Sequence, residues 1–145
     1  MREAILRGGI VRTRRNPLVV ERRAIKERAP ITLHLPFPPS ANNLFLNVSG
    51  SARIPTPAYE SWRAAAANAI LRSRSRRMNG QVEIFMVFEE RAGRGDIANA
   101  ASVCLDLLAA KGVIETDDSR VVRRLTLQWG DVPGAMIEIR SCDRP

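Results

Sequence analysis

The sequence predicts an α+β fold in which two helices pack on a mixed four-stranded sheet. The chain has 145 residues, about the length of one domain, and 45% of them are apolar, so it can bury a hydrophobic core. Four segments have the alternating pattern of strands, and two have the apolar spacing of helices. The strands are expected at 31–35, 82–88, 121–129 and 135–140, and the helices at 59–78 and 97–110.

The first strand is expected to be half-buried. From Ile31 to Leu35 apolar side chains alternate with polar ones, one of which is His34. This histidine fits a solvated or packed strand residue better than a catalytic base. A proline-rich run at 36–43 ends the strand, because proline cannot continue a hydrogen-bond ladder. Residues 51–57 are expected to form a short extended element or a loop.

The first helix has alanine-rich helical spacing that includes Trp62 and Ile70. Arginines crowd its last turns, where cations complement the negative end of the helix dipole and would also suit a phosphate contact. Asn79 and Gly80 end this helix. The strand at 82–88 is apolar on both faces, which is typical of a strand inside a sheet.

The second helix buries one apolar face and ends at Gly112. Cys104 belongs to that face and is expected to be a buried thiol. The last two strands flank the turn at 130–134 and are expected to pair as a hairpin. The apolar face consists of Ile97, Ala101, Cys104, Leu105 and Leu108.

The charge of the chain favours a polyanionic partner. The formal net charge is +8, the pI is about 11.1, and all but two of the 23 basic residues are arginine. The planar fork of arginine matches phosphate oxygens, so nucleic acid is favoured over an ordinary basic surface. Residues 1–30 carry many of these arginines and are expected to form a flexible arm, whereas 31–145 form the folded domain.

The cysteines and the hydropathy pattern narrow the class of protein further. Cys104 and Cys142 have no metal-ligand spacing and form no disulfide framework. No signal-peptide pattern is visible, and no apolar run approaches the ~20 residues that a membrane span requires. A cytoplasmic protein with no membrane partner is therefore expected.

The acidic unit between Asp96 and Asp118 is the candidate site. Asp96 directly precedes the second helix, where a carboxylate can cap free backbone amides. Asn99, Ser102 and Asp106 recur at spacings of three and four and share a polar helix face. These positions alone fit a helix cap and a solvated face.

The adjacent carboxylates Asp117 and Asp118 favour a functional interpretation, because a turn explains one aspartate more readily than two. If the strand that follows them lies beside the one that ends near Glu89, the sheet would bring Asp118 close to Asp96. Converging carboxylates inside a basic protein would form a site for Mg²⁺ or Mn²⁺, which prefer oxygen ligands.

Several motifs in the same order resemble those of the RusA-type Holliday junction resolvases, small dimeric endonucleases common in bacteria and their prophages. The resemblance covers residues 31 to about 140. The motifs are a P-P-S-x-N turn at Pro38–Asn42, Y-x-x-W at Tyr59–Trp62, D-x-x-N at Asp96–Asn99, D-x-L at Asp106–Leu108, a glycine with two apolar residues at Gly112–Ile114, and the pair Asp117–Asp118 before Val121 and Val122.

The resemblance implies a homodimeric, Mg²⁺-dependent endonuclease that resolves four-way DNA junctions in recombination and repair. Asp96 and Asp118 would be metal-binding catalytic residues, Asp117 would assist them, and Asn99 would orient the site. The resemblance also implies that the partner is branched DNA, held by its backbone. The expected DNA contacts are Arg91, Arg94, Arg120, Arg76 and Asn42.

Two positions depart from the family pattern. Ala98 stands where the family usually has a second metal-binding aspartate, and Ser102 stands where it has a lysine that meets DNA or the scissile phosphate. Either Asp106 or Glu115 replaces the missing ligand, or the chain is a decayed prophage gene product, or the positions were substituted in the laboratory.

These departures leave two alternatives open. One is a catalytically inactive protein of the same fold that binds branched DNA. The other is a basic RNA- or ribosome-associated protein in which the acidic unit is structural.

Overall fold

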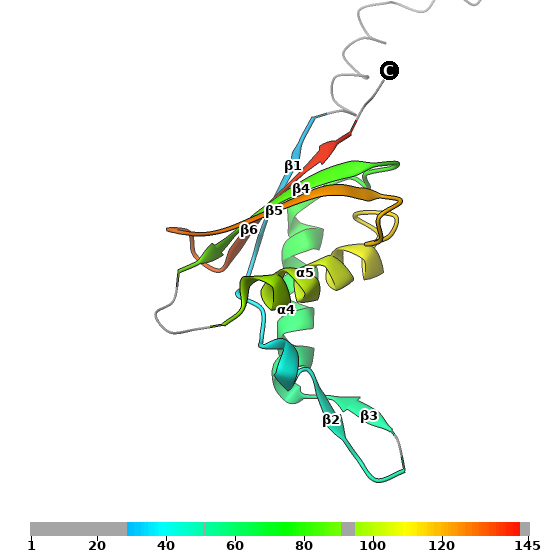
Figure 1. Ribbon diagram of the computed structural model, residues 1–145, viewed down its shortest axis with the longest axis vertical. Helices are drawn as coiled ribbons and strands as arrows, with labels where there is room; N and C mark the ends of the chain where they lie inside the picture. The colour runs from blue at the N-terminus through cyan, green and yellow to red at the C-terminus, as the bar shows by residue number, and fades with distance from the viewer. Residues whose placement is uncertain (1–28, 51, 91–94, 143–145) are drawn as a thin grey trace, which may run out of the picture.

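The computed structural model describes residues 29–50, 52–90 and 95–142. A mixed four-stranded sheet carries two helices on one face (Figure 1), so the predicted α+β class is confirmed. The expected arm at 1–30 lies almost wholly outside the described residues. In chain order the elements are β1 (Ile31–Leu35), the 3-10 helix η1 (Ala41–Asn43), β2 (Phe45–Asn47), β3 (Arg53–Pro55), α4 (Pro57–Ser73), β4 (Val82–Glu89), α5 (Ile97–Ala110), β5 (Val122–Gly130) and β6 (Ala135–Ser141).

The strand order is β1-β6-β4-β5, and β4 runs parallel to β5 but antiparallel to β6. The expected hairpin of the last two strands is therefore wrong, because β4 lies between them. β4 is an inner strand, as the sequence indicated: one face is fully buried and the other is partly buried. Most residues of β5 are exposed, as suits an edge strand.

The turn between β5 and β6 passes over the end of β4. The backbone amide of Glu89 donates to the carbonyl of Gly134, and that of Glu90 donates to Gly130. Gly134 has a φ of 65°, and a Cβ on it would collide with the carbonyl oxygen of Leu35. Only glycine permits both the backbone angle and this close approach.

Helix α4 ends earlier than the sequence pattern predicted. Thr56 caps its start by accepting a hydrogen bond from the amide of Tyr59 (3.2 Å), and Pro57 occupies the first turn. Arg74 takes a left-handed conformation with a φ of 52°, which ends the helix. The chain then runs to Met78, whose amide donates to the carbonyl of Val113.

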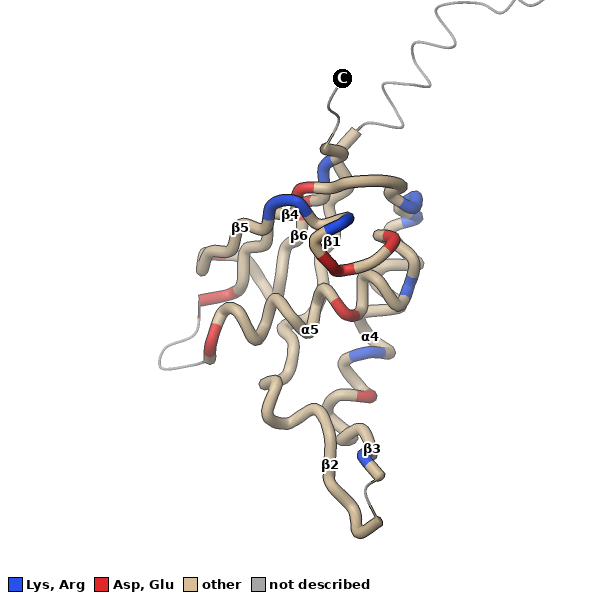
Figure 2. The backbone as a smooth tube through the Cα atoms, turned by 45° about the vertical axis from the view of Figure 1, so that its right-hand side comes forward, with Lys and Arg blue, Asp and Glu red and all other residues tan. Residues whose placement is uncertain are grey.

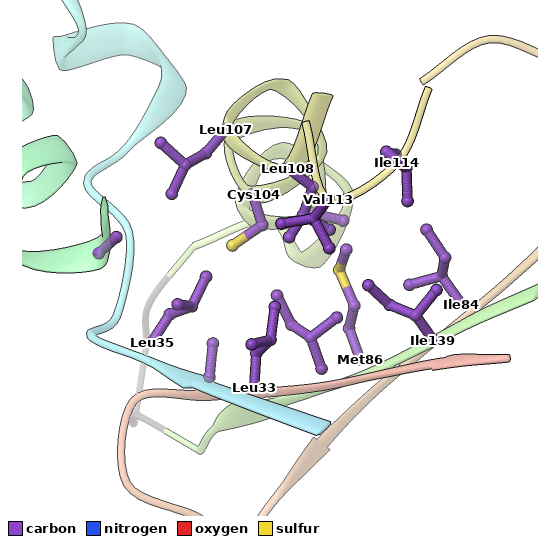
Figure 3. Packing of buried hydrophobic residues seen from close by; sticks show 14 of the residues in the cluster. Leu33, Leu35, Ile84, Met86, Cys104, Leu107, Leu108, Val113, Ile114 and Ile139 are labelled. Atoms are coloured by element: carbon purple, nitrogen blue, oxygen red, sulfur yellow. The ribbon is translucent and has the colours of Figure 1, made fainter. Parts of the chain in front are cut away.

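The hydrophobic core lies between the sheet and the helices. Figure 3 shows Met86 of β4 pointing toward Leu108 and Val113, and Ile84 lying opposite Ile114. Cys104 is fully buried, which confirms the predicted buried thiol, and burial raises its pKa to about 12. Cys142 is half-buried, and both cysteines are free. In the part of the chain that is described, no helix has the length and apolar character to cross a membrane.

A small hairpin of β2 and β3 projects away from the sheet (Figure 1), where the sequence suggested only an extended element or a loop. Its apolar residues Leu46, Val48 and Ile54 are exposed. The guanidinium of Arg53 lies 4.5 Å from the centre of the Phe45 ring, a cation–π contact across the two strands.

Two leucines test the extent of the core, because they allow the same substitution in opposite surroundings. Leu108 is 0% exposed and Leu71 is 73% exposed. Leu108→Ala should lower the free energy of unfolding by about 2–5 kcal/mol, and Leu71→Ala should change it by less than about 0.5 kcal/mol. Urea denaturation of both variants measures the difference, and equal losses would contradict the packing described above.

Candidate functional site

Asp96 caps the start of α5, as the sequence predicted. Its carboxylate oxygen Oδ1 accepts a hydrogen bond from the amide of Ala98 at 2.9 Å, and its backbone is extended. Among the described residues no other hydrogen bond holds this carboxylate. Asn99 and Ser102 follow on the exposed face of the helix. One carboxylate edge of Asp96 is thus available to a ligand.

Asp118 is held in a turn by Arg120. The guanidinium Nη2 of Arg120 donates to Oδ2 at 2.6 Å, its backbone amide donates to Oδ1 at 2.9 Å, and the hydroxyl of Thr116 lies 3.2 Å from Oδ2. The hydrogen bonds from Arg120 are the main reason that the pKa of Asp118 falls from 3.8 to about 2. Asp118 is therefore a carboxylate at neutral pH.

Asp106 lies beside the same turn. Its pKa is raised, first by loss of solvent and then by the hydrogen bond and the negative charge of Asp117. Glu115 is also nearby in the chain, and its Oε1 accepts a hydrogen bond from the amide of Gly80 at 3.2 Å. Of the two candidate replacement ligands, Asp106 contacts Asp117, whereas Glu115 is bonded to Gly80.

Within one chain Asp96 and Asp118 are far apart, so their expected proximity is wrong. β4 and β5 are neighbours as expected, but they are parallel: Val82 pairs with Val122, and β4 and β5 end side by side. Asp118 therefore precedes the starts of both strands, whereas Asp96 follows the end of β4. Asp117 lies beside Asp106 of α5, so about 15 Å of helix separates Asp96 from the group that contains Asp117 and Asp118.

The acidic residues form two groups as a result. Figure 2 shows acidic positions in red at both ends of α5. Among the described residues no three His, Cys, Asp or Glu side chains come together in a way that could hold a metal ion. The described part of a single chain does not fit a divalent-cation site.

Most of the described basic residues gather at the Asp118 end of the sheet. Arg140 pairs in register with Glu83 at the start of β4, and Arg120 leads into β5. The end of α4 reaches the same region through the contact of Met78 with Val113. The basic residues of this end are Arg72, Arg74, Arg76, Arg77, Lys111, Arg120, Arg123, Arg124 and Arg140.

The other expected DNA contacts have mixed surroundings. Arg76 is half-buried, and its guanidinium donates to the carbonyl of Ala29 at 2.5 Å, so it also holds the chain before β1. Asn42 is exposed in η1, where its backbone amide donates to the hydroxyl of Ser40 at 3.3 Å. Arg91 and Arg94 lie outside the described residues.

A pocket of about 410 Å³ opens beside Asp96 and was not predicted. Phe37 and Trp129 contribute aromatic rings to its lining, and Asn43 and Asn99 contribute amide groups. The sequence gives little indication of this pocket. Phe37 belongs to a proline-rich turn and Trp129 to the end of a strand, and nothing in the sequence links the two. Only the fold brings them together.

The Y-x-x-W motif is bonded to the segment that leads into the P-P-S-x-N turn. The indole N–H of Trp62, in the Y-x-x-W motif, donates to the carbonyl of Pro36 at 2.8 Å, just before the P-P-S-x-N turn. The rings of Tyr59 and Trp62 are nearly parallel, with centroids 6.4 Å apart. Helix α4 therefore positions the turn that borders the pocket.

A sequence model of the endodeoxyribonuclease RusA family matches residues 36–140. The chain belongs to the RusA family. RusA proteins are endodeoxyribonucleases that resolve Holliday junctions in DNA recombination, act on branched DNA and generally depend on a divalent metal. No curated protein sequence matches the chain. The match includes Asp96, Asn99 and Asp118 together with Ala98 and Ser102.

The contact between Arg120 and Asp118 predicts that the pKa of Asp118 will rise when Arg120 is replaced. Because the folded pKa of Asp118 lies below its ordinary value, the pair stabilises the fold above about pH 4 and loses this contribution as the pH falls through about 2. Arg120→Gln should raise the pKa of Asp118 toward 3.8. Carboxyl carbon NMR titration measures it.

Arg123→Gln is the matched control, because Arg123 donates to the carbonyl of Ser119 at 2.8 Å and not to Asp118. An Asp118 pKa that moves equally in both variants would mean that general positive charge, and not the direct contact, lowers it.

Proposed function

We propose that this RusA-family chain is a homodimeric endonuclease that depends on Mg²⁺ or Mn²⁺ and resolves four-way junctions during DNA recombination and repair. Asp96, Asp118, Asp117 and Asn99 are its proposed site residues. The family match over residues 36–140 carries the proposal, because it includes every one of these positions. Their exposure at the two ends of α5 is consistent with a role outside the core.

The separation of the two acidic groups supports a site shared between two copies. Two chains packed in opposite directions would place Asp96 and Asn99 of each copy beside Asp117 and Asp118 of the other. A two-fold pair of this kind has two equal sites, which suits paired cuts in a roughly two-fold junction.

Charge favours the same arrangement. The Asp118 end of the described chain is basic, whereas Glu89, Glu90, Asp96 and Asp131 lie at the other end. Acidic residues remain in excess there even when Arg91 and Arg94 of the same connection are counted from the sequence. Opposite ends would therefore attract each other in an antiparallel dimer.

The arginines of the Asp118 end are the proposed backbone contacts, together with Asn42, Arg91 and Arg94. Arg76 would contribute charge while it holds Ala29. Arg120 is paired with Asp118 in the free chain. A DNA phosphate that takes over the guanidinium would leave the Asp118 carboxylate with fewer partners.

A junction-binding protein that does not cut is the second candidate, and the residues at two positions favour it. Ala98 and Ser102 are exposed on α5 and supply neither a carboxylate nor an ammonium group. Such a protein would keep the same fold and the same basic surface. Cleavage, and not binding, separates the two candidates.

The decisive assay follows a labelled four-way junction by gel shift and by cleavage, with and without Mg²⁺ or Mn²⁺. Metal-dependent paired cuts are expected. Asp96→Asn should reduce them by at least about 10- to 100-fold, whereas Glu60→Gln, which removes the same charge from the exposed first turn of α4, should not. A gel shift without cuts would support the non-cutting candidate.

A double variant would then test the state of the site. A large gain in cutting by A98D with S102K would show that the site is degraded.

A mixing experiment tests the shared site. Asp96→Asn and Asp118→Asn should each be inactive alone, but a mixed dimer would contain one site with both carboxylates intact. Mixing the two inactive proteins should therefore restore cutting at about one site in each mixed dimer. Sedimentation checks the oligomeric state. No recovery in a mixture that has exchanged subunits would contradict a shared site.

A further inference from the structure

The pocket beside Asp96 has an apolar wall that is already in place. The rings of Phe37 and Trp129 are nearly parallel, at 11° and with centroids 6.4 Å apart, and both are partly exposed. Phe88, which is fully buried, meets each of them edge-on at 6.2 and 6.3 Å. Core packing therefore holds these two rings at the surface in the absence of a ligand.

The lining of the pocket also includes hydrogen-bonding groups. The side-chain amides of Asn43 and Asn99 are exposed, and within the described residues neither makes a hydrogen bond. Each amide can donate and accept. The carboxylate of Asp96 adds an acceptor at the edge of the pocket.

Aromatic rings and donor and acceptor groups in one pocket match the chemistry of a nucleobase. Bases stack on aromatic side chains through their faces and are read by amides along their edges. The volume of about 410 Å³ lies within the range of roughly 300–1,000 Å³ typical of small-ligand pockets. One nucleotide fits this space.

We propose that the pocket receives one unpaired nucleobase from the branch point of the DNA, stacked against Trp129 with its edge toward Asn43 and Asn99. This inference rests on the proposed function. Bases within an intact duplex are paired and stacked on both sides, whereas the pairs that flank a branch point open more easily and can release a base into the pocket. A base held in the pocket would place the neighbouring DNA backbone next to Asp96. The protein would therefore prefer branched DNA over linear DNA.

The fluorescence of Trp129 can report whether a base stacks on it. The chain has two tryptophans, and the other, Trp62, is buried with its indole N–H bonded to Pro36. A base stacked on Trp129 should quench its fluorescence. The experiment titrates the full chain, in buffer without divalent metal, with a four-way junction, with the same junction carrying abasic sites at the branch-point nucleotides, and with a linear duplex.

The intact junction should quench the fluorescence and should bind on the order of 10-fold more tightly than the abasic junction, as expected for one stacked base. Trp129→Phe should remove the quenching and leave binding nearly unchanged, because it keeps an aromatic ring. Phe37→Leu and Asn43→Ala should reduce the preference for the intact junction. Leu71→Ala, an exposed residue on α4, should not. Thermal unfolding confirms that each variant is folded.

A junction that shifts in the gel but quenches no more than its abasic form would overturn the base pocket and leave the proposed function standing. Equal quenching by the linear duplex would also overturn it, because a duplex offers no unpaired base. If no junction binds, both the pocket and the proposed function fail.

Discussion

The parallel pairing of β4 with β5 is the constraint on which the rest of the structure depends. Parallel strands cannot be joined by a tight turn, so the chain must return along the sheet before the second strand begins. Helix α5 makes this return and also supplies the apolar face that covers β4. The two connections of the helix therefore lie at opposite ends of the sheet, and the chain places Asp96 in one and Asp118 in the other.

The sequence predicted the elements better than their arrangement. Periodicity is a local property, so the helix with Cys104 on its buried face and the inner position of β4 were both predicted correctly. Strand partners depend on contacts between distant segments. The hairpin of β5 and β6 was predicted from their neighbouring positions in the chain, but β4 pairs with both strands and lies between them. The early end of α4 at Arg74 depends on a single left-handed residue that alanine-rich periodicity does not reveal. The β2–β3 hairpin is short and exposed, so it has no strong pattern.

The candidate site shows the same division. The capping role of Asp96 follows from one local position and was predicted. The convergence of Asp96 and Asp118 was inferred because β4 and β5 were expected to be neighbours, without considering the direction of the strands. Because the two strands are parallel, the two aspartates lie at opposite ends of the sheet. The pocket formed by Phe37 and Trp129 joins segments more than 90 residues apart, and no spacing along the chain announces it. Chemistry that depends on one turn can be predicted from sequence, whereas chemistry assembled by the sheet needs the fold.

The different burial of the two cysteines gives the molecule a natural chemical handle. Cys104 is sealed in the core as a protonated thiol, so alkylating reagents reach Cys142 first. The amide of Cys142 donates to the carbonyl of Gln81, and Ser141 pairs with Val82, which places the thiol beside the starts of β4 and β5. A dye or spin label on native Cys142 would therefore report on the Asp118 end of the sheet while the Asp96 pocket, at the far end, stays unmodified. No engineered cysteine is needed for distance measurements between labelled copies.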